Sequence, residues 1–413
     1  MKFIHFLLLL VVVMSLSACQ PTQQIIGNPE RPYPPAKEPV IGDILHLPTG
    51  IYVSQAEMLE QTLRVQVIFV GETHDNPASH RLQEEILEAL QQRNPDRVTL
   101  AMEMFTPSQQ ATLDRWVAGN LSEKDFLKQV GWYRNWSMNF AFYRNLLTFC
   151  RDHQIPILAL NAEKELTQKV GRSAFKDLSI EEQQHLPQMD YNDPYQTAMV
   201  KAFHAGHKSG QAMEDGFQRV QTLWDESMAE NLADYLKGRE KNHQVMVVAG
   251  GNHVRYGFGI PRRMFRRIPA SYLLIGSEEI HIPDDKQDRL MDVKKPEFPM
   301  PPYHFMLFTA YEDLPNAGVK LGIMLGQAEG GLIIREVMPG SIAEKYDLRK
   351  DDLLTHIDGQ VLKEPFDLIY ELQQKTPGDT IELTLERITE KTKKTIHVDE
   401  GEFTETKHTE KPL

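Results

Sequence analysis

The chain has very little cysteine: two residues, Cys19 and Cys150, in a length of 413. This excludes a disulfide framework of the kind that holds small secreted proteins together. Basic residues are also in the minority, with 45 Lys and Arg against 58 Asp and Glu and a net charge of −13. This balance argues against a nucleic acid as the main partner, because nucleic-acid-binding domains present a basic surface.

Local catalytic signatures are missing as well. The sequence contains no HExxH, no GxSxG and no Cys/His zinc pattern. The signatures of the common metalloproteases and serine hydrolases are therefore absent. No internal repeat with a fixed period is apparent either, which argues against a solenoid.

Long apolar runs are scarce, and the first one is too short to span a membrane. It covers Phe6–Val13 after Lys2, whereas a spanning helix needs about 20 apolar residues. Small residues at Leu16–Ala18 then precede Cys19. This pattern predicts a secretory signal over residues 1–18 and resembles a bacterial lipobox, with cleavage before Cys19 and lipid on its thiol. An ordinary signal peptide followed by a chance cysteine is the alternative.

The resemblance to lipoproteins implies attachment to the bacterial outer membrane, since Gln20 and not Asp follows Cys19. Two or more acyl chains anchor a protein stably where one chain does not. If Cys19 carries lipid, no intrachain disulfide can form, and we expect Cys150 to be a buried, inert thiol.

Composition divides the chain into segments with different roles. The strand and helix patterns are bounded by Pro-rich and charged stretches, which indicate tethers and a tail. We expect a tether at 19–44, an α/β domain at 45–285, a Pro-rich linker at 286–315, a small β-rich domain at 316–399 and a charged tail at 400–413.

The region 45–285 alternates apolar runs with helical patterns. This alternation predicts a mostly parallel sheet covered by helices, an α/β fold. The strands are expected at 65–70, 97–105, 156–162, 244–253 and 270–277. The helices are expected at 78–92, 107–118, 122–130, 140–153 and, as one long segment, 194–236.

Polar residues end each of the first four strands. The carboxyl ends of parallel strands meet at one edge of a sheet, so these side chains are expected to share one rim. Gly71, Gly250 and Gly251 would relieve backbone crowding there. Taken singly, each residue reads as an ordinary strand end. The four endings together predict a site. In chain order, the residues at these strand ends are Glu72 and His74, Glu103, Asn161, and Asn252 and His253.

Three chemistries suit this set of residues. His74 and His253 could bind a divalent metal. A carboxylate beside an imidazole could activate water, which would make the protein a hydrolase acting through Glu72, His74, Glu103 and His253. The same rim could bind a porphyrin, with Arg255 or Arg262 near its carboxylates and a Tyr or His on its iron.

Several motifs along the chain resemble one known family. They are "GETHDNPASHRLQ", "AMEMF", "GWYRNWSMNFAFYRNLL", "ALNA", "QTLWDESMAENLADYL" and "AGGNHVRYGFGIPRRM". In this order they are similar to the ChaN-like haem-binding uptake proteins of the Tiki-like superfamily, over residues 45–280. The family's two Gly-x-x-His motifs match Gly71–His74 and Gly250–His253, and Glu103 matches its second-strand carboxylate.

The resemblance implies an iron-regulated lipoprotein that binds haem for iron uptake. Other branches of the superfamily are metal-dependent proteases or esterase-like hydrolases, so an enzyme remains the alternative. Haem held between two copies, a homodimer, is implied as well. The family's haem ligand is a tyrosine, for which Tyr133, Tyr143, Tyr195 and Tyr256 are candidates. We expect the haem site to include Glu72, His74, Glu103, Asn161, His253, Arg255 and Tyr256.

Some residues near these motifs have a simpler interpretation. Trp132, Trp136 and Trp224 could line an apolar pocket, but packing between helices is the expected role of each. Asp225 could reach inward to hold Arg255 or a rim histidine. The favoured interpretation of Asp225 is a solvated helix face.

Residues 316–399 resemble a PDZ domain. The similarity rests on Leu321–Met324, on the Pro339–Ala343 segment and on "DDLLTHIDGQ". PDZ domains add an extended peptide to a sheet edge and hold its C-terminal carboxylate on backbone N–H groups. The resemblance implies peptide binding at Leu321, Gly322, Ile323 and Met324. A spacer or a dimer contact is the alternative role.

Overall fold

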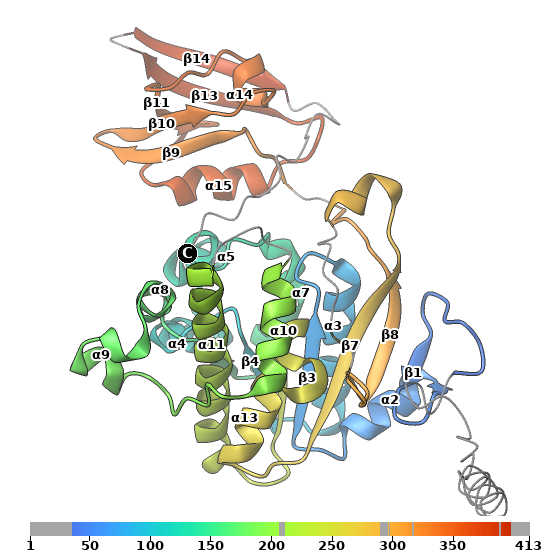
Figure 1. Ribbon diagram of the computed structural model, residues 1–413. Helices are drawn as coiled ribbons and strands as arrows, with labels where there is room; N and C mark the ends of the chain where they lie inside the picture. The colour runs from blue at the N-terminus through green and yellow to red at the C-terminus, as the bar shows by residue number, and fades with distance from the viewer. Residues whose placement is uncertain are drawn as a thin grey trace, which may run out of the picture.

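The computed structural model describes residues 35–205, 211–289, 296, 298–315, 318–387 and 390–397. The predicted signal peptide, Cys19 and the charged tail lie outside the described residues. Figure 1 shows two bodies, an α/β domain and a smaller β-rich domain joined to it near helix α15 (Pro365–Gln373).

The α/β domain is built on an eight-stranded sheet. The five predicted strands are present as β3 (Val67–Glu72), β4 (Val98–Met102), β5 (Ile157–Ala159), β6 (Gln244–Gly250) and β7 (Tyr272–His281). They lie in the order β7-β3-β6-β4-β5, and all pair in parallel. The predicted α/β fold class is therefore confirmed.

Helices pack on the two faces of this sheet because alternate strand residues face opposite sides. Ile68 and Val70 of β3 belong to one core cluster, and Val67 and Phe69 belong to the other. The first face is covered by α3 (Pro77–Arg93), α4 (Gln110–Val117), α5 (Glu123–Val130), α6 (Trp132–Asn135) and α7 (Arg144–Asp152). The second is covered by α11 (Gln211–Lys237), α12 (Gly251–Val254) and α13 (Ile260–Arg267).

The predicted long segment at 194–236 consists of two helices, α10 (Pro194–Ala205) and α11, which pack on each other. The helices α8 (Lys164–Arg172) and α9 (Ile180–Gln184) lie to one side of α11 (Figure 1). Their small core includes Val170, Leu178, Val220 and Leu223.

Three strands of the sheet were not predicted. They are β1 (Ile44–His46), β2 (Ile51–Val53) and β8 (Phe305–Ala310), which extend the order to β2-β1-β8-β7. Strand β8 lies inside the predicted linker, 286–315, and pairs in parallel with β7. The structure thus corrects the end of that linker to a strand, because Phe305, Met306 and Phe308 bury their side chains in the two cores.

The second domain is an antiparallel sheet in the order β14-β13-β11-β10-β9, so β9 (Ile323–Ala328) is an edge strand. Its other strands are β10 (Gly331–Val337), β11 (Leu353–Ile357), β12 (Gln360–Val361), β13 (Thr380–Arg387) and β14 (Glu390–His397). Helices α14 (Ile342–Lys345) and α15 pack on the sheet, and α15 lies beside β9. The predicted β-rich domain is confirmed.

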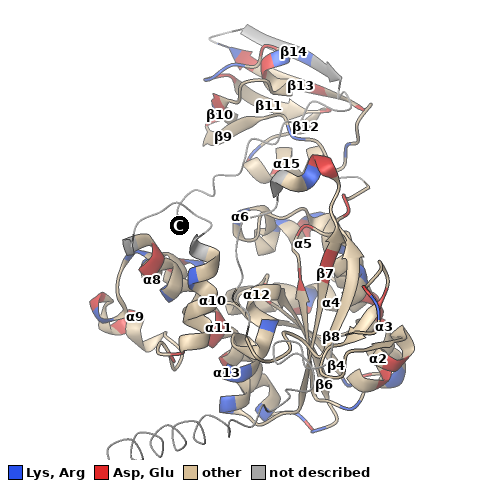
Figure 2. Ribbon diagram, turned by 45° about the vertical axis from the view of Figure 1, so that its right-hand side comes forward, with Lys and Arg blue, Asp and Glu red and all other residues tan. Residues whose placement is uncertain are grey.

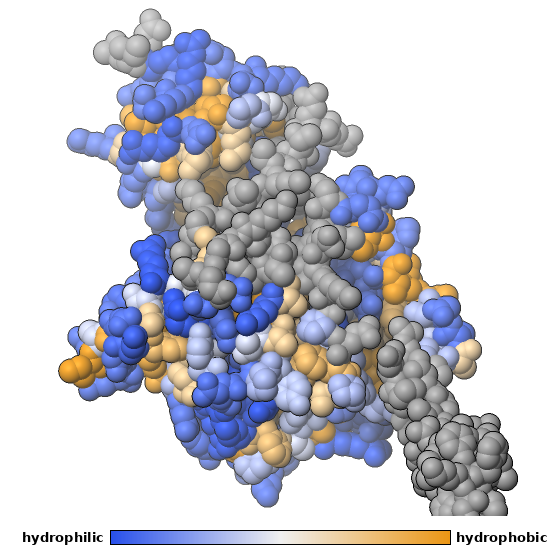
Figure 3. Space-filling model, viewed as in Figure 1, coloured by the Kyte–Doolittle hydropathy of each residue, from blue (hydrophilic) through white to orange (hydrophobic). Residues whose placement is uncertain are grey.

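Among the described residues, no helix has both the length and the apolar character that crossing a membrane requires. The face drawn in Figure 3 carries hydrophilic side chains over most of both domains, with apolar side chains in small separate patches.

A pair of methionine substitutions tests the assignment of β8. Met306 is 2% exposed in the core, whereas Met300, just before the strand, is 48% exposed. We expect Met306→Ala to lower the free energy of unfolding by about 2–5 kcal/mol, because it leaves a core cavity. Met300→Ala should change it by less than about 0.5 kcal/mol. Equal, small effects in urea denaturation would show that β8 is a surface linker.

Candidate functional site

The sheet brings the ends of β3, β4 and β6 to one rim. Glu72 at the end of β3 pairs in register with Gly250 at the end of β6, and Met102 of β4 pairs with Val248. A side chain on Gly71 would lie 3.2 Å from the backbone of Gly251, so the two loops approach more closely than larger residues would allow. The predicted role of these glycines agrees with this geometry.

The first half of the rim is centred on Glu72, whose side chain is fully buried. His74 Nδ1 lies 2.7 Å from Glu72 Oε1, and the Tyr143 hydroxyl donates to the same oxygen at 2.6 Å. Gln83 of α3 donates its side-chain N–H to the other oxygen. His80 Nδ1 lies 3.8 Å from that oxygen. Glu72 thus orients the ring of His74, whose side chain is 32% exposed.

The second half is centred on His253, in the short helix that follows β6. Its Nδ1 lies 2.7 Å from Asp225 Oδ1 on α11, and its Nε2 lies 3.4 Å from Glu103 Oε1 after β4. Glu103 also accepts a hydrogen bond from the backbone N–H of Gly250 at 2.7 Å. Three different elements therefore hold this buried imidazole between two carboxylates.

The two halves meet at Gly250. A side-chain carbon on that residue would lie 2.9 Å from His74 Nε2 and 3.6 Å from Glu103 Oε2. Only glycine leaves room for the imidazole to approach the strand end. The structure thus places His74, Glu103 and His253 on the same side of the domain.

Electrostatics make the rim an array of ion pairs. Burial alone would raise the pKa of Glu103, but the charge and hydrogen bond of His253 lower it to about 2. Burial would lower the pKa of His253, but Glu103 and Asp225 raise it well above its usual range. Burial likewise opposes a charged His74, yet the hydrogen bond and charge of Glu72 raise its pKa. Carboxylates and imidazoles therefore stabilise each other's charged forms.

The structure corrects the favoured interpretation of Asp225. A solvated helix face was expected, but the residue is 3% exposed and bonded to His253. The alternative interpretation, a carboxylate that holds a rim histidine, matches the structure. A buried carboxylate on a helix is stable only when it is paired, and the imidazole provides that partner.

Two of the tryptophans also contact the rim. The Trp136 ring packs edge-on against His74, with centroids 5.0 Å apart, and the Trp224 ring lies 6.2 Å from that of His253. Helix packing describes Trp132, which is buried among Phe105, Phe140 and Tyr143. The expectation of helix packing is incomplete for Trp136 and Trp224, because both also contact a rim histidine.

Other predicted residues lie elsewhere. The amide oxygen of Asn161 accepts a hydrogen bond from the N–H of the next residue, so that group serves the local loop. Arg262 is paired with Asp193 at 2.7 Å. Arg255 lies over the ring of Tyr303, 5.3 Å from its centroid. These three residues are not part of the ion-pair array.

The four candidate tyrosines occupy different environments. Tyr143 is buried and bonded to Glu72, and burial and that carboxylate raise its pKa well above its usual range. Tyr133 packs on Phe366 of the second domain. Tyr195 and Tyr256 both stack on Phe258, at centroid distances of 5.2 and 5.5 Å. Tyr256 also adopts a left-handed backbone conformation, with φ of 58°.

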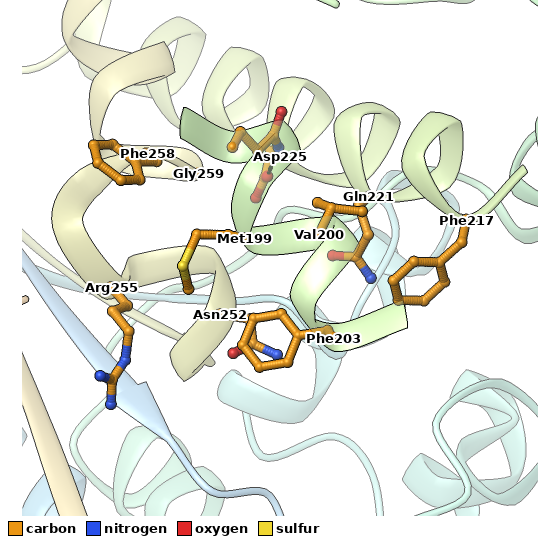
Figure 4. Close-up of a pocket in the computed structure, with 11 residues that line it drawn as sticks. Met199, Val200, Phe203, Phe217, Gln221, Asp225, Asn252, Arg255, Phe258 and Gly259 are labelled. Atoms are coloured by element: carbon orange, nitrogen blue, oxygen red, sulfur yellow. Dashed lines mark hydrogen bonds between the residues drawn. The ribbon is translucent and has the colours of Figure 1, made fainter. Parts of the chain in front are cut away.

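A small pocket lies next to the second half of the rim (Figure 4). It has a volume of about 30 Å³. Met199, Phe203 and Phe217 of α10 and α11 contribute apolar walls, and Arg255 lies at one edge. Phe258 links the pocket to Tyr195 and Tyr256. The pocket thus combines aromatic and aliphatic surface with polar side chains, among them Arg255, Asp225 and Asn252.

Two site residues, His80 and Gln83 of α3, were missed by sequence reasoning. Both are buried beside Glu72, on the helix face that carries Leu87 and Leu90 into the core. Polar residues on the apolar face of a helix were the available signal, because such residues are buried only with partners.

Over the described part of the chain, no group of three or more His, Cys, Asp or Glu side chains is arranged to hold a metal ion. The metal site expected at His74 and His253 therefore has no support from the geometry.

Fold and rim define a parallel α/β domain with a buried polar site at the carboxyl ends of its strands. The chain belongs to the family described as haem-binding uptake, Tiki superfamily, ChaN, whose model matches residues 58–264, half of the chain. A PDZ domain model matches residues 319–399. Both family resemblances drawn from the sequence are confirmed.

Several known proteins are similar to parts of the chain. A structure of ChaN from Campylobacter jejuni, described as showing cofacial heme binding, has 16% identity and a TM-score of 0.49, covering 64% of this chain and 95% of that one. The HtrA3 PDZ domain with a phage-derived ligand has 17% identity and a TM-score of 0.18, covering 19% and 82%.

A plant relative, the chloroplastic protein RETICULATA-RELATED 5 of Arabidopsis thaliana, is 22% identical over 254 residues. The match covers 56% of this chain and 34% of that protein. The chain thus spans about a third of the length of that curated relative.

The buried pairing of Glu103 predicts a loss of stability in acid. Its folded pKa is about 2, against 4.5 for an unperturbed Glu, so its contribution is present above pH 4.5 and is lost as the pH falls toward 2. The loss should be about 3 kcal/mol. We expect Glu103→Gln to remove this part of the pH dependence, measured by urea denaturation between pH 2 and 5.

Glu182 provides a matched control, because its pKa is also about 2 but its partner Lys169 is exposed. Solvent screens such a pair. Glu182→Gln should therefore change the pH dependence less than Glu103→Gln does. Equal changes in the two variants would contradict the burial argument.

Proposed function

We propose that the α/β domain binds haem, or another iron porphyrin, at the rim. Membership of a haem-binding uptake family supports this assignment. The observation that assigns particular residues to haem binding is the pocket beside the rim, which has aromatic and thioether walls and one arginine at its edge. A porphyrin needs apolar surface for its ring and a cation for its carboxylates.

The residues present suit a haem that lies across the mouth of the pocket. A cavity of about 30 Å³ has room for about one water molecule, whereas enclosed ligand sites measure roughly 300–1,000 Å³. The macrocycle would therefore rest on the aromatic surface of Phe258 and its neighbours, with a carboxylate near Arg255. When bound, haem would supply an iron centre that a protein side chain can ligate.

Tyr256 is the residue that we propose as the iron ligand. Tyr143 is committed to Glu72, and Tyr133 is covered by the second domain. Tyr195 and Tyr256 remain next to the pocket wall. Tyr256 is held in its left-handed conformation by a hydrogen bond from its N–H to the Pro302 carbonyl, by stacking on Phe258 and by an edge-on contact with Phe298. Such backbone strain is typical of functional positions.

Glu72, His74, Glu103 and His253 are proposed to shape the site and to set its charge. Their side chains hold one another across β3, β4 and β6, so the rim keeps its form when a ligand binds or leaves. The hydrolase alternative is not favoured, because the family model that matches this chain is described as haem-binding uptake.

The cellular setting is also part of the proposal. The lipobox-like sequence before Cys19 supports anchoring of the protein by lipid on the bacterial outer membrane, where it would serve iron uptake. A homodimer that shares haem is proposed on the family resemblance alone.

The PDZ domain is proposed to hold the C-terminal end of a partner protein. The carbonyls of Leu321 and Gly322 accept hydrogen bonds from Ala343 and Met338. In a trans peptide the N–H points away from the carbonyl, so the N–H groups of Gly322 and Ile323 face the opposite side. Together with the free edge of β9, through Met324, they can bind a carboxylate and an extended strand.

Tyr256→Phe tests the haem site, because it keeps the stacked ring and removes the hydroxyl. We expect hemin affinity to fall more than tenfold, since ligand-supporting residues alone are worth about 10–100-fold. The Soret band of the remaining complex should also shift. Absorbance titration of hemin into the purified protein measures both effects.

Tyr195→Phe is the matched control, since it also loses only a hydroxyl from a ring stacked on Phe258. Its hemin affinity should stay close to that of the wild type. If the two effects are reversed, Tyr195 is the ligand. If the wild type shows no Soret change at all, the haem proposal is wrong.

Peptide capture can be tested by selecting displayed random peptides with free C-termini on the immobilised protein. We expect the selected peptides to end in an apolar residue, and their C-terminal amides to bind at least tenfold more weakly, because a charge-assisted hydrogen bond of about 1.5–3 kcal/mol is lost. Gly322→Ala should abolish binding, because the new carbon would lie 2.3 Å from Ser341 at a φ of 73°. Equal binding of acid and amide would contradict the assignment.

A further inference from the structure

Helix α15 packs on both domains. Its residues Leu368 and Leu372 are buried in the core of the PDZ sheet. Phe366 and Tyr370, four residues apart, point the other way and pack against the core cluster of the α/β domain. Figures 1 and 2 both place α15 beside α5, and Figure 2 also shows α6 next to it. One helix thus borders the peptide-binding edge β9 and also forms the interface between the domains.

Complementary charges hold this interface together. Lys124 Nζ lies 2.7 Å from Glu371 Oε1 and 4.8 Å from the centre of the Tyr370 ring. Lys128 Nζ lies 2.7 Å from Glu364 Oε1, near the other end of the helix. The two lysines are one turn apart on α5, and they match Glu364, which caps the start of α15, and Glu371 near its end.

The interface between the two domains is also connected to the rim through helix α6. Tyr133 of α6 packs on Phe366, with ring centroids 5.8 Å apart. Three residues later, Trp136 packs edge-on against His74. Trp132 of the same helix contacts Tyr143, which donates to Glu72. The short helix α6 therefore lies between α15 and the first half of the rim.

We propose that the PDZ domain regulates the rim: α15 docked on α5 and α6 holds Trp136 against His74, and a peptide that enters beside α15 alters this contact and the affinity of the rim ligand. The effect on affinity rests on the haem binding proposed above. The docked interface and its contact with the rim are independent of it.

The physical basis is that both ligands act on one element. A peptide added to β9 lies between that strand and α15, so it contacts the helix whose other face is fixed to the α/β domain. A haem bound at the rim as proposed would lie near His74, whose ring is in contact with Trp136. Coupling between two binding sites is reciprocal, and its usual size is a factor of about 5–150 in affinity.

Reversal of the two lysine charges tests the proposal in the full-length chain. In Lys124→Glu with Lys128→Glu, like charges face Glu364, Asp367 and Glu371, which should separate the domains. The exchanged variant, which adds Glu364→Lys, Asp367→Asn and Glu371→Lys, should bring the domains together again, because opposite charges then face each other and no acid opposes the new glutamates. Lys169→Glu, which affects the distant exposed pair with Glu182, is a matched surface control. Solution X-ray scattering reports the separation.

The readout at the rim is fluorine NMR of protein labelled with 5-fluorotryptophan, with Trp136 assigned through Trp136→Phe. We expect the Trp136 resonance to move in the reversed variant, to return in the exchanged variant and to stay unchanged in Lys169→Glu. Trp224, on the other face of the sheet, serves as the internal reference. The hemin dissociation constant should change at least about fivefold with the same pattern.

Three outcomes would overturn the proposal. The first is a reversed variant whose domains stay together, and the second is a separated variant with an unchanged Trp136 resonance. The third is a shifted resonance with unchanged hemin affinity. If the wild type binds no hemin, the haem proposal fails by itself, and the scattering and Trp136 measurements still decide whether α15 docking positions the rim.

Discussion

The candidate site depends on one buried imidazole, His253, held between Asp225 and Glu103. A charged ring in this position is stable because a carboxylate lies on each side. The charge of the ring, together with hydrogen bonds from Gly250 and Gln196, stabilises the two carboxylates in turn. Removing one member of a buried pair typically costs about 3–5 kcal/mol, since the partner is left without compensation. The interaction therefore ties α11, the end of β4 and the start of α12 into one arrangement.

The parallel sheet makes this arrangement possible. Strand β6 lies between β3 and β4, so the residues that follow all three strands meet without a long loop. Gly250 and Gly251 let His74 and the neighbouring backbone approach the strand end. Glu72, His74 and Tyr143 then form a second ion-pair and hydrogen-bond cluster beside the first. The polar groups at the rim are thus fixed by the strands, and the apolar pocket beside them is built by α10, α11 and the loop at Phe258.

Much of this could be predicted from the sequence, for physical reasons that differ between elements. Strands β3, β4 and β6 are buried on both faces, so they appear as continuous apolar runs, and their polar ends are easy to recognise. Strand β8 follows several prolines, which favour extended linkers, and its pairing with β7 depends on residues far away in the chain. The burial of Asp225 could not be predicted, because no local pattern of the sequence indicates it. It depends on the pairing with His253, which follows a different strand. The docking of α15 depends on surface charges of two domains, which no local pattern reveals.

The proposed haem site lies at the rim that carries His74 and His253. Proton–nitrogen NMR of protein labelled with ¹⁵N-histidine tests it directly, because the ferric iron of hemin broadens the signals of nearby imidazoles. We expect added hemin to broaden the signals of His74 and His253 first and to leave those of the distant His153 and His185 sharp. Broadening of His153 or His185 with sharp rim signals, or no selective broadening at all, would contradict it.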